Sequence, residues 1–209
     1  MKLILENLLR LYIERKHRVN LIQFLKQFVL HTTKTGAITP SSDGLADLIT
    51  DTAGLHSASV VIEFGTGTGV FTEKILQKIP VETRYFALEV NPDFVKATRK
   101  RCPEAIVYQD SAANAKKYLD ELGINECDCI ICGLPWAAFS EELQNELLDT
   151  IIDILRPGGK FLTFAYLQGL LLPAGMRFKK KLSVRFNKVT KTRTVWLNFP
   201  PAFVYCAEK

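Results

Sequence analysis

The chain has 209 residues, of which 47% are hydrophobic, and carries a formal net charge of +5. This length suits one α/β core with a small appendage, and the absence of repeats or low-complexity stretches excludes a solenoid or a disordered tail protein. The five cysteines show no framework spacing, which excludes a disulfide-stapled secreted domain and favours a reduced, cytosolic compartment.

The N-terminal segment, residues 1–35, is predicted to form one or two amphipathic helices. Apolar residues recur at helical spacing from Leu5 to Ile13 and again from Val19 to Val29, with Arg15-Lys16-His17-Arg18 between them. Charged residues interrupt the apolar positions, so the segment is neither a signal-peptide core nor a membrane span. It fits equally a helix pair packed on the domain and an interfacial membrane anchor.

Basic residues gather at the two ends of the chain. Residues 1–40 hold seven Lys/Arg against two acids, and residues 176–209 hold nine against one, which leaves the middle acidic. Basic rims attract polyanions, and both RNA and an anionic membrane surface remain open on charge alone.

From residue 36 onward the pattern predicts a single α/β domain, 36–209. Thr35–Asp43 is a turn segment, and Ser41 or Ser42 then caps a helix over Gly44–Thr50. Strands are expected near 59–64, 84–89, 105–108, 127–132 and 160–165, with helices near 70–79, 92–101, 113–122 and 140–155, and a helix-stop turn at Arg156-Pro157-Gly158-Gly159. Such alternation predicts a doubly wound, parallel sheet.

Past Tyr166 the alternation stops. Leu167 to Pro173 is apolar, Lys179-Lys180-Lys181 is a basic run, and two strand-like segments follow near 187–199 and 202–207. Two closing strands predict an antiparallel end to the sheet, and hence seven strands that are mostly parallel.

Three cysteines fall in the apolar run 127–132. Cys127, Cys129 and Cys132 could alternate along a strand or hold a zinc ion. No histidine or second cysteine pair follows at ligand spacing, so the strand is favoured and no metal is predicted.

Residues Val60 to Gly69, Val-Val-Ile-Glu-Phe-Gly-Thr-Gly-Thr-Gly, form the most informative motif of the chain. A buried strand runs into a turn whose glycines allow positive φ and close approach of a ligand, and a helix follows. The dinucleotide fingerprint needs Gly or Ala where this chain has Val70. Glu63 before the turn suits an amino group, and Glu89, after the next strand, can accept ribose hydroxyls. The set favours S-adenosylmethionine over NAD or a purely structural turn.

From Gly36 to Lys209 the chain resembles the class I S-adenosylmethionine-dependent methyltransferases, through its E-x-G-x-G-x-G motif and the later acid. The resemblance implies a Rossmann-like fold and a set of cofactor contacts. Asp110 would accept from the adenine amine, although an acid there could equally cap the next helix. The implied cofactor-binding residues are Ile38, Pro40, Ser41, Glu63, Gly65, Thr66, Gly67, Gly69, Glu89, Val90, Asp110 and Ser111.

Gly133-Leu134-Pro135-Trp136 follows the fourth strand, where this fold presents the atom to be methylated. Enzymes acting on the adenine amine carry Asn, Asp or Ser first, because an acceptor must hold that weak nucleophile. Gly133 offers none, while Trp136 could hold a cationic amine by cation–π attraction. The substrate amine is therefore expected to be aliphatic.

Together with the segment Gly36–Ser42, these motifs resemble the bacterial phospholipid N-methyltransferases, which are similar in sequence to the ribosomal RNA adenine dimethyltransferases. The resemblance implies methylation of phosphatidylethanolamine toward phosphatidylcholine. We expect a monomeric or loosely associated enzyme that docks on the inner, cytoplasmic face of the cell membrane through the helices of residues 1–35, which would also form a lid over the active site. The chain lacks the helical C-terminal domain of the RNA enzymes, so nucleic acid is not the expected partner. The alternatives are an RNA adenine N6-dimethyltransferase, an ornithine-lipid N-methyltransferase, and a catalytically silent S-adenosylmethionine-binding module.

The reaction requires a neutral amine, and a free alkylamine has a pKa of about 10.4 in water. Desolvation would lower that pKa, and a lipid phosphate or a tyrosine could take the proton. Tyr166 is a candidate, although an ordinary strand-end aromatic is as good a reading, and Tyr12 requires the N-terminal helix to close over the site. The basic groups at 15–18 and at Arg177 to Lys181 would contact lipid phosphates, or form a solvated run.

Overall fold

The structure is a computed structural model that describes residues 42–171, 173–198 and 200–209. All of them belong to one compact unit, Thr39–Lys209. The predicted helices of residues 1–35, Tyr12, and the predicted cofactor contacts Ile38, Pro40 and Ser41 lie outside the described residues.

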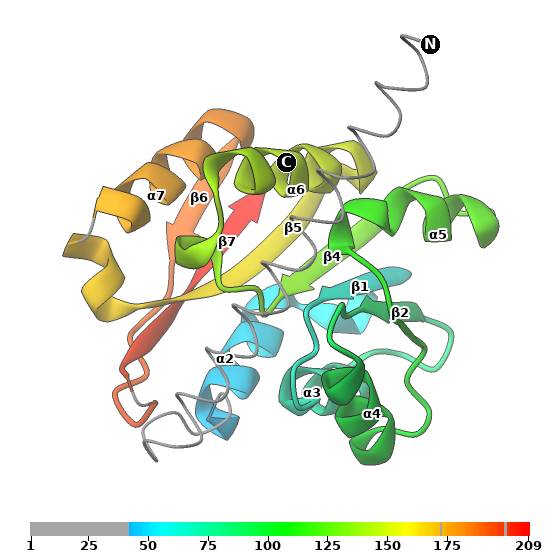
Figure 1. The fold of residues 1–209 in the computed structure, drawn as a ribbon. Coiled ribbons are helices and arrows are strands. Elements are labelled where there is room, and N and C mark those ends of the chain that lie inside the picture. The colour runs from blue at the N-terminus through cyan, green and yellow to red at the C-terminus, as the bar shows by residue number, and fades with distance from the viewer. Residues whose placement is uncertain (1–41, 172, 199) are drawn as a thin grey trace, which may run out of the picture. The chain divides into compact units, whose positions relative to one another are not determined.

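A seven-stranded sheet forms the centre of the unit, in the order β3-β2-β1-β4-β5-β7-β6 (Figure 1). The neighbours from β3 to β5 are parallel, and β7 runs antiparallel to both β5 and β6. The predicted fold class, a Rossmann-like and mostly parallel sheet, is confirmed. The strands are β1 (Val60–Phe64), β2 (Arg84–Leu88), β3 (Val107–Tyr108), β4 (Cys127–Cys132), β5 (Leu155–Tyr166), β6 (Lys188–Lys191) and β7 (Ala202–Glu208).

Helices cover both faces of this sheet, which makes a three-layer domain. Figure 1 shows α2, α3 and α4 on one face and α5, α6 and α7 on the other. All five residues of β1 are buried, as expected for a central parallel strand. The helices are α2 (Asp43–Ala53), α3 (Val70–Lys78), α4 (Pro92–Arg101), α5 (Ala115–Glu121), α6 (Glu141–Ile154) and α7 (Pro173–Arg185). Short 3-10 turns are η1 (Leu55–Ser57), η2 (Ala112–Asn114), η3 (Trp136–Ala138) and η4 (Leu167–Leu171).

Local capping explains why several helices begin where the sequence predicted. The Ser42 hydroxyl accepts from the Leu45 amide at 3.3 Å, and α4 begins with Asn91 as cap and Pro92 in its first turn. Ser140 caps α6 by accepting from the Leu143 amide at 3.3 Å. These signals are local, so the sequence carried them in full.

Two segments differ from the prediction. Arg156–Gly159 is an irregularity inside β5 rather than a turn before it, because the register passes from Cys127↔Leu155 to Cys129↔Lys160 and the C-terminal Lys209 pairs with Gly158 and Gly159. Of the strand predicted over 187–199, only Lys188–Lys191 forms β6, and beyond it Val195 makes an isolated bridge to Ala202 of β7.

The segment between β5 and β6 contains α7, a helix that the sequence prediction left out. Its basic residues and Gly175 interrupt the pattern of apolar positions from which a helix would be predicted. Packing on the rest of the domain buries Phe178 and Leu182. Tertiary contact therefore decides this helix.

Cys127–Cys132 forms β4, as predicted, and its three cysteines are buried. Burial raises the pKa of the Cys127 and Cys132 thiols to about 12, so both stay protonated. Within residues 42–209 as described, no three His, Cys, Asp or Glu side chains cluster as a metal ion would require. None of the described helices has the length and apolarity needed to cross a membrane.

Candidate functional site

Four parallel strands place the predicted site residues along one edge of the sheet. Phe64 is in register with Leu88 and Cys132, and Leu88 is in register with Tyr108. The residues that follow these strands therefore begin at a common carboxyl edge, the place where open α/β sheets bind ligands. The glycine turn, Glu89, Asp110 and Gly133 all belong to that edge.

The turn after β1 has the backbone conformation that its glycines predicted. Gly65, Gly67 and Gly69 have φ of 77°, 54° and 83°, a region that favours glycine. A Cβ on Gly67 would meet nothing within 4 Å, so this part of the turn is open. Gly69 precedes α3, whose N-terminus has no side-chain cap. The turn thus presents backbone amides at a helix N-terminus, which suits a polar ligand.

Thr98 on α4 contacts this turn and stabilises it. Its hydroxyl lies 2.9 Å from the Thr66 hydroxyl and 3.1 Å from the Gly67 carbonyl oxygen, and it is fully buried. A Cβ on Gly69 would stand 3.2 Å from the Thr98 Cα, so a larger residue there would push α4 away. Sequence reasoning missed Thr98, because a threonine inside an otherwise charged helix carries no motif.

Glu63 is fully buried at the end of β1 and has one oxygen without a partner. Its Oε2 accepts hydrogen bonds from the Thr72 hydroxyl at 2.7 Å and the Tyr85 hydroxyl at 2.5 Å. Its Oε1 has no hydrogen-bond partner among the described residues. Desolvation raises the pKa of Glu63 to about 7, and the nearby Glu89 charge adds to the rise. A buried unpaired acceptor costs about 1–3 kcal/mol, which a donor from a ligand would relieve.

Glu89 lies directly beside the glycine turn. It is 5% exposed, and its Oε2 accepts from the Gly67 amide at 3.1 Å while Oε1 accepts from the Asn91 amide at 2.9 Å. Burial raises the pKa of Glu89, and the backbone amides around it act in the opposite direction. Hydroxyl groups of a ligand in this turn would donate to the same two carboxylate oxygens that the backbone amides contact.

Asp110 and Ser111 organise the start of η2. Asp110 accepts from the Ser111 amide at 2.7 Å, from Asn114 Nδ2 at 2.9 Å and from the Tyr118 hydroxyl at 3.0 Å. Ser111 caps η2 by accepting from the Ala113 amide at 3.3 Å. The capping interpretation therefore describes contacts that the structure contains, and the adenine contact of Asp110 stays a prediction.

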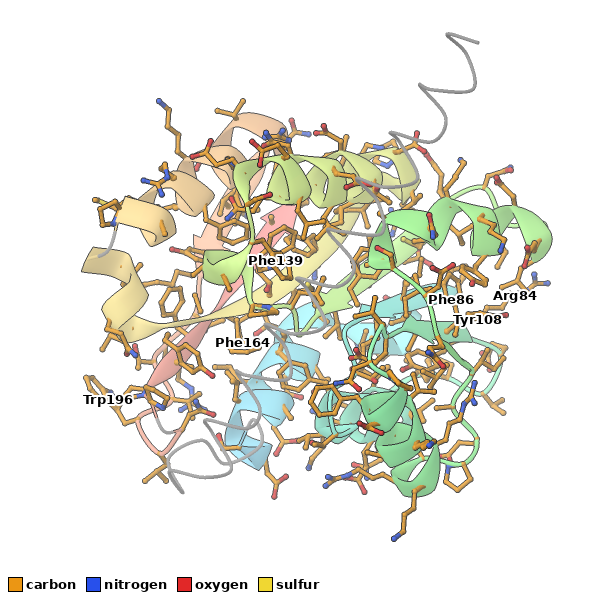
Figure 2. All side chains as sticks on the ribbon, in the orientation of Figure 1. Arg84, Phe86, Tyr108, Phe139, Phe164 and Trp196 are labelled. Atoms are coloured by element: carbon orange, nitrogen blue, oxygen red, sulfur yellow. The ribbon has the colours of Figure 1, made fainter. Side chains whose placement is uncertain are left out.

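An aromatic group lies next to Asp110. Tyr108 stacks on Tyr118 with ring centroids 4.1 Å apart, and Phe86 contacts Tyr108 edge-on at 5.8 Å. Figure 2 shows Phe86 and Tyr108 close together on this side of the sheet. The Tyr118 hydroxyl that donates to Asp110 is thus held in place by ring packing on Tyr108.

Gly133 packs against the glycine turn. Its amide donates to the Phe64 carbonyl oxygen at 2.8 Å, and a Cβ on Gly133 would stand 2.5 Å from the Gly65 carbonyl oxygen. A Cβ on Gly65 would in turn meet Leu134 Cδ2 at 2.6 Å. The prediction took Gly133 as a missing acceptor, and the structure adds a steric reason for the glycine.

Trp136 does not present the open ring face that the sequence suggested. It is 4% exposed and lies stacked on Phe178 of α7, with ring centroids 4.8 Å apart. Its Nε1 donates to the Thr163 hydroxyl at 3.1 Å, and its carbonyl oxygen accepts from Gln144 Nε2 at 2.8 Å. Because the sequence prediction lacked α7, it could not foresee this cover. In this arrangement Trp136 anchors the loop that carries Leu134 and Pro135.

Tyr166 ends β5 and is half-buried. Its ring contacts Phe164 edge-on at 5.6 Å, and Figure 2 shows Phe164 on the side of the sheet that α2 covers. Burial raises the pKa of Tyr166, which leaves even less phenolate at neutral pH than an exposed tyrosine would supply. The phenol can donate or accept a hydrogen bond, but it is a weak base.

The basic residues of α7 divide into two groups. Arg177 Nε lies 3.3 Å from Glu141 Oε1, and Lys181 Nζ lies 3.9 Å from Glu141 Oε2. Lys179 and Lys180 are exposed. Arg177 and Lys181 are therefore engaged with α6, and Lys179 and Lys180 face solvent as the prediction requires.

Sequence comparison shows relatives among methyltransferases. A model described as a methyltransferase domain matches residues 61–159. The chain is 29% identical over 185 residues to the ornithine lipid N-methyltransferase of Singulisphaera acidiphila, covering 87% of this chain and 92% of that protein. It is also 31% identical over 117 residues to an uncharacterized methyltransferase-like protein of Schizosaccharomyces pombe, covering 56% of this chain and 42% of that protein.

Solved structures share the fold at low sequence identity. An O-methyltransferase from Bacillus cereus, in complex with S-adenosylhomocysteine, matches with a TM-score of 0.65 at 12% identity, covering 88% of this chain and 90% of that chain. The O-methyltransferase TomG from Streptomyces achromogenes, in complex with S-adenosylmethionine, matches with a TM-score of 0.62 at 19% identity, covering 81% and 82%. The described sheet and glycine turn therefore belong to a fold that is shared with methyltransferases.

Proposed function

We propose that this chain is a class I S-adenosylmethionine-dependent methyltransferase that transfers methyl groups to the aliphatic amine of a membrane lipid. An ornithine-bearing lipid is the substrate that the proposal favours. The observation that carries the proposal is the match to an ornithine lipid N-methyltransferase along 92% of that protein. Phosphatidylethanolamine, which the sequence motifs favoured, presents the same kind of primary amine and becomes the comparison substrate. The phosphatidylethanolamine assignment itself has no support from the comparisons.

The described residues fit the cofactor. Glu63 has a buried, unpaired oxygen that would accept from the amino group of S-adenosylmethionine, and Glu89 holds its carboxylate beside the glycine turn, where ribose hydroxyls would donate to it. The open turn at Gly67 leaves room for close approach of the ligand to the backbone. When bound, the cofactor supplies an electrophilic methyl group. The residues proposed to hold it within the described part of the chain are Glu63, Gly65, Thr66, Gly67, Gly69, Glu89, Val90, Asp110 and Ser111.

Leu134 and Pro135, between Gly133 and Trp136, are proposed to position the amine. The Trp136–Thr163 hydrogen bond and the Phe178 stack fix the end of this loop, and contact with Gly65 fixes its beginning. A loop held at both ends keeps the nucleophile oriented, which can account for much of the rate of a bimolecular transfer. The apolar side chains of Leu134 and Pro135 would also disfavour the ammonium form, so the neutral amine becomes more available.

Methylation of an adenine amine fits the site less well. An acceptor side chain at position 133 would collide with the Gly65 carbonyl oxygen, so the site cannot carry one without moving the glycine turn. An aliphatic amine needs no such acceptor, because its own lone pair is strongly nucleophilic once the proton is lost. The steric constraint therefore favours a lipid amine over a nucleobase.

We further propose that the enzyme acts as a monomer bound to the inner, cytoplasmic face of the cell membrane. Lys179 and Lys180 are exposed on α7, and each basic group near an anionic surface contributes about 1 kcal/mol. Salt should therefore release the enzyme from vesicles.

The test measures S-adenosylhomocysteine release with three substrates in parallel: vesicles containing ornithine lipid, vesicles containing phosphatidylethanolamine, and unmethylated ribosomal RNA. The proposal expects turnover with ornithine lipid and a lipid mass increase of one or more methyl groups. At cofactor concentrations below saturation, Glu89→Gln serves as the control with weakened cofactor binding. Glu82→Gln, which changes an exposed acid near the start of β2, is the matched control that should keep its activity. Turnover with RNA alone would overturn the proposal. Turnover with phosphatidylethanolamine alone would keep a lipid amine as the substrate but replace ornithine lipid by phosphatidylethanolamine.

A further inference from the structure

The loop between β6 and β7, described for residues 192–198 and 200–201, lies at the same edge of the sheet as the candidate site. Tyr166, the last residue of β5, pairs with Ala202, the first residue of β7. Lys191, the last residue of β6, pairs with Tyr205. The loop that joins these strands therefore emerges at the carboxyl end of β5, on the edge that carries the glycine turn and Gly133.

The tip of this loop exposes two large apolar side chains. Trp196 is 70% exposed and Leu197 is 95% exposed. Figure 2 shows Trp196 at the outer end of the loop, pointing away from the domain. Tryptophan and leucine side chains that stay in water lose the favourable free energy that burial would give them. Adjacent exposed apolar side chains of this kind mark contact surfaces.

The base of the loop, by contrast, is firmly attached. Val195 forms a bridge with Ala202, and the buried Asn198 accepts from both the amide and the hydroxyl of Ser42 at 3.0 Å. Asn198 Nδ2 also donates to the Pro200 carbonyl oxygen at 2.7 Å. Val195 and Asn198 thus flank the exposed pair, and Asn198 ties the loop to Ser42, the residue that caps α2.

The charged residues of β6 and of the loop itself are all basic. Residues 188–201 contain Lys188, Lys191 and Arg193 and no acidic residue. Lys188 and Lys191 are exposed, with the Lys191 Nζ 5.2 Å from the centre of the Phe203 ring, and Arg193 is exposed on the loop itself. An exposed tryptophan and leucine bordered by cations match the interface of an anionic bilayer, where amphipathic rings lie at headgroup level and cations meet phosphates.

We propose that the β6–β7 loop is a membrane wedge: Trp196 and Leu197 enter the interfacial layer of an anionic bilayer while Lys191 and Arg193 contact lipid phosphates. This inference rests on the proposed lipid substrate and extends it, because the wedge holds the carboxyl edge of the sheet against the headgroups. Single-stranded RNA could stack on Trp196, but a fully exposed leucine gains nothing from stacking. The apolar pair therefore favours lipid.

The chain contains two tryptophans, Trp136 and Trp196, of which Trp136 is buried, so Trp196 is a natural depth probe. The experiment titrates the full chain with phosphatidylglycerol–phosphatidylcholine vesicles that carry brominated acyl chains, and Trp196→Phe gives the Trp136 background. The proposal expects a blue shift and bromine quenching of the Trp196 signal. Vesicle binding without quenching of Trp196 would overturn the wedge, as would a Trp196 response to single-stranded RNA and none to vesicles.

A matched pair of variants tests the apolar contribution. Leu197→Asp should weaken vesicle affinity by about tenfold or more, as loss of one buried leucine predicts. Val81→Asp is the control, because Val81 is also fully exposed but lies in the turn before β2, at the opposite edge. Equal losses in the two variants would show that general charge, and not the loop, sets the affinity.

Two further readouts separate the wedge from the proposed function. Leu197→Asp should keep its activity on lipid amine dispersed in detergent, where no bilayer has to be entered, and should keep its affinity for S-adenosylhomocysteine. If no lipid is methylated and yet Trp196 is quenched by vesicles, the proposed function fails and the surface stands. If lipid is methylated and Leu197→Asp binds vesicles as tightly as the unchanged chain, the wedge fails alone.

Discussion

Gly133 lies so close to Gly65 that a Cβ added to it would stand 2.5 Å from the Gly65 carbonyl oxygen. The relationship joins the loop after β4 to the turn after β1, two segments that are neighbours only because β1 and β4 are paired in the sheet. The proposed amine-positioning loop and cofactor turn are therefore one packed unit. A change in either is expected to disturb both.

Gly133→Ala should accordingly impair cofactor binding as well as catalysis. The added methyl group has to displace backbone, so we expect the affinity for S-adenosylhomocysteine to fall by about tenfold and the melting temperature to drop. Gly169→Ala is the control, because a Cβ there would meet nothing within 4 Å. Calorimetric titration of both variants checks this, and equal affinities would show that the two segments separate at little cost.

Cofactor affinity should rise with pH because of Glu63. Its pKa of about 7 means that the free carboxyl is partly protonated near neutrality, while a cationic ligand favours the ionised form. Binding should therefore release a proton, and the affinity should increase between about pH 6 and 8. Titration calorimetry in two buffers of different ionisation enthalpy counts the released protons. Glu63→Gln should bind more weakly and without this proton release, and an unchanged pH profile in that variant would assign the titration to another group.

The same group predicts how stability depends on pH without ligand. The pKa of Glu63 is higher in the folded chain than its ordinary value of 4.5, so the folded state holds more protons between those two values. Stability should then fall as pH rises from about 4.5 to 7, by a few kcal/mol in the limit of full burial. Urea unfolding across this range is the measurement. In Glu63→Gln the slope should be shallower, and an identical slope would contradict the prediction.

Glu89 is expected to act on binding more than on the chemical step. Glu89→Gln removes the charge that accepts from the Gly67 amide, and should raise the dissociation constant for S-adenosylhomocysteine by about tenfold or more. The turnover number at saturating cofactor should change much less. Glu82→Gln is the control, because Glu82 is exposed. A loss in turnover with unchanged affinity would instead place Glu89 near the reacting atoms.

The hydrogen bond between Trp136 and Thr163 should contribute about 1 kcal/mol to stability. Trp136→Phe and Thr163→Val each remove it, so the double variant should be less destabilised than the sum of the single ones. Trp196→Phe, a change at an exposed tryptophan, should leave stability unchanged. Chemical denaturation of the unchanged chain, the two single variants and the double variant completes the cycle. Strict additivity of the changes in unfolding free energy would show that the hydrogen bond contributes nothing.

Much of the fold followed from local signals along the chain. The strands at 127–132 and 84–88 and the helix at 92–101 were predicted nearly residue for residue, because apolar runs and Asn-Pro or Ser caps act over a few positions. The acids that follow successive strands could be placed on one edge for the same reason, since parallel strands end together. Side-chain partners across the sheet, such as Tyr85 on Glu63, could not be foreseen from one sequence.

The sequence by itself determined the order of strands and helices up to β5, the positive-φ turn at Gly65–Gly69 and the acids at 63, 89 and 110, because periodicity and glycine stereochemistry are local properties. The tertiary structure alone decided that α7 forms and that Phe178 covers Trp136. It also decided that a Cβ at Gly133 meets Gly65, and that the loop with Trp196 and Leu197 emerges at the site edge. Each of these depends on contacts between residues far apart in the chain, whose free energy appears only when the sheet is assembled.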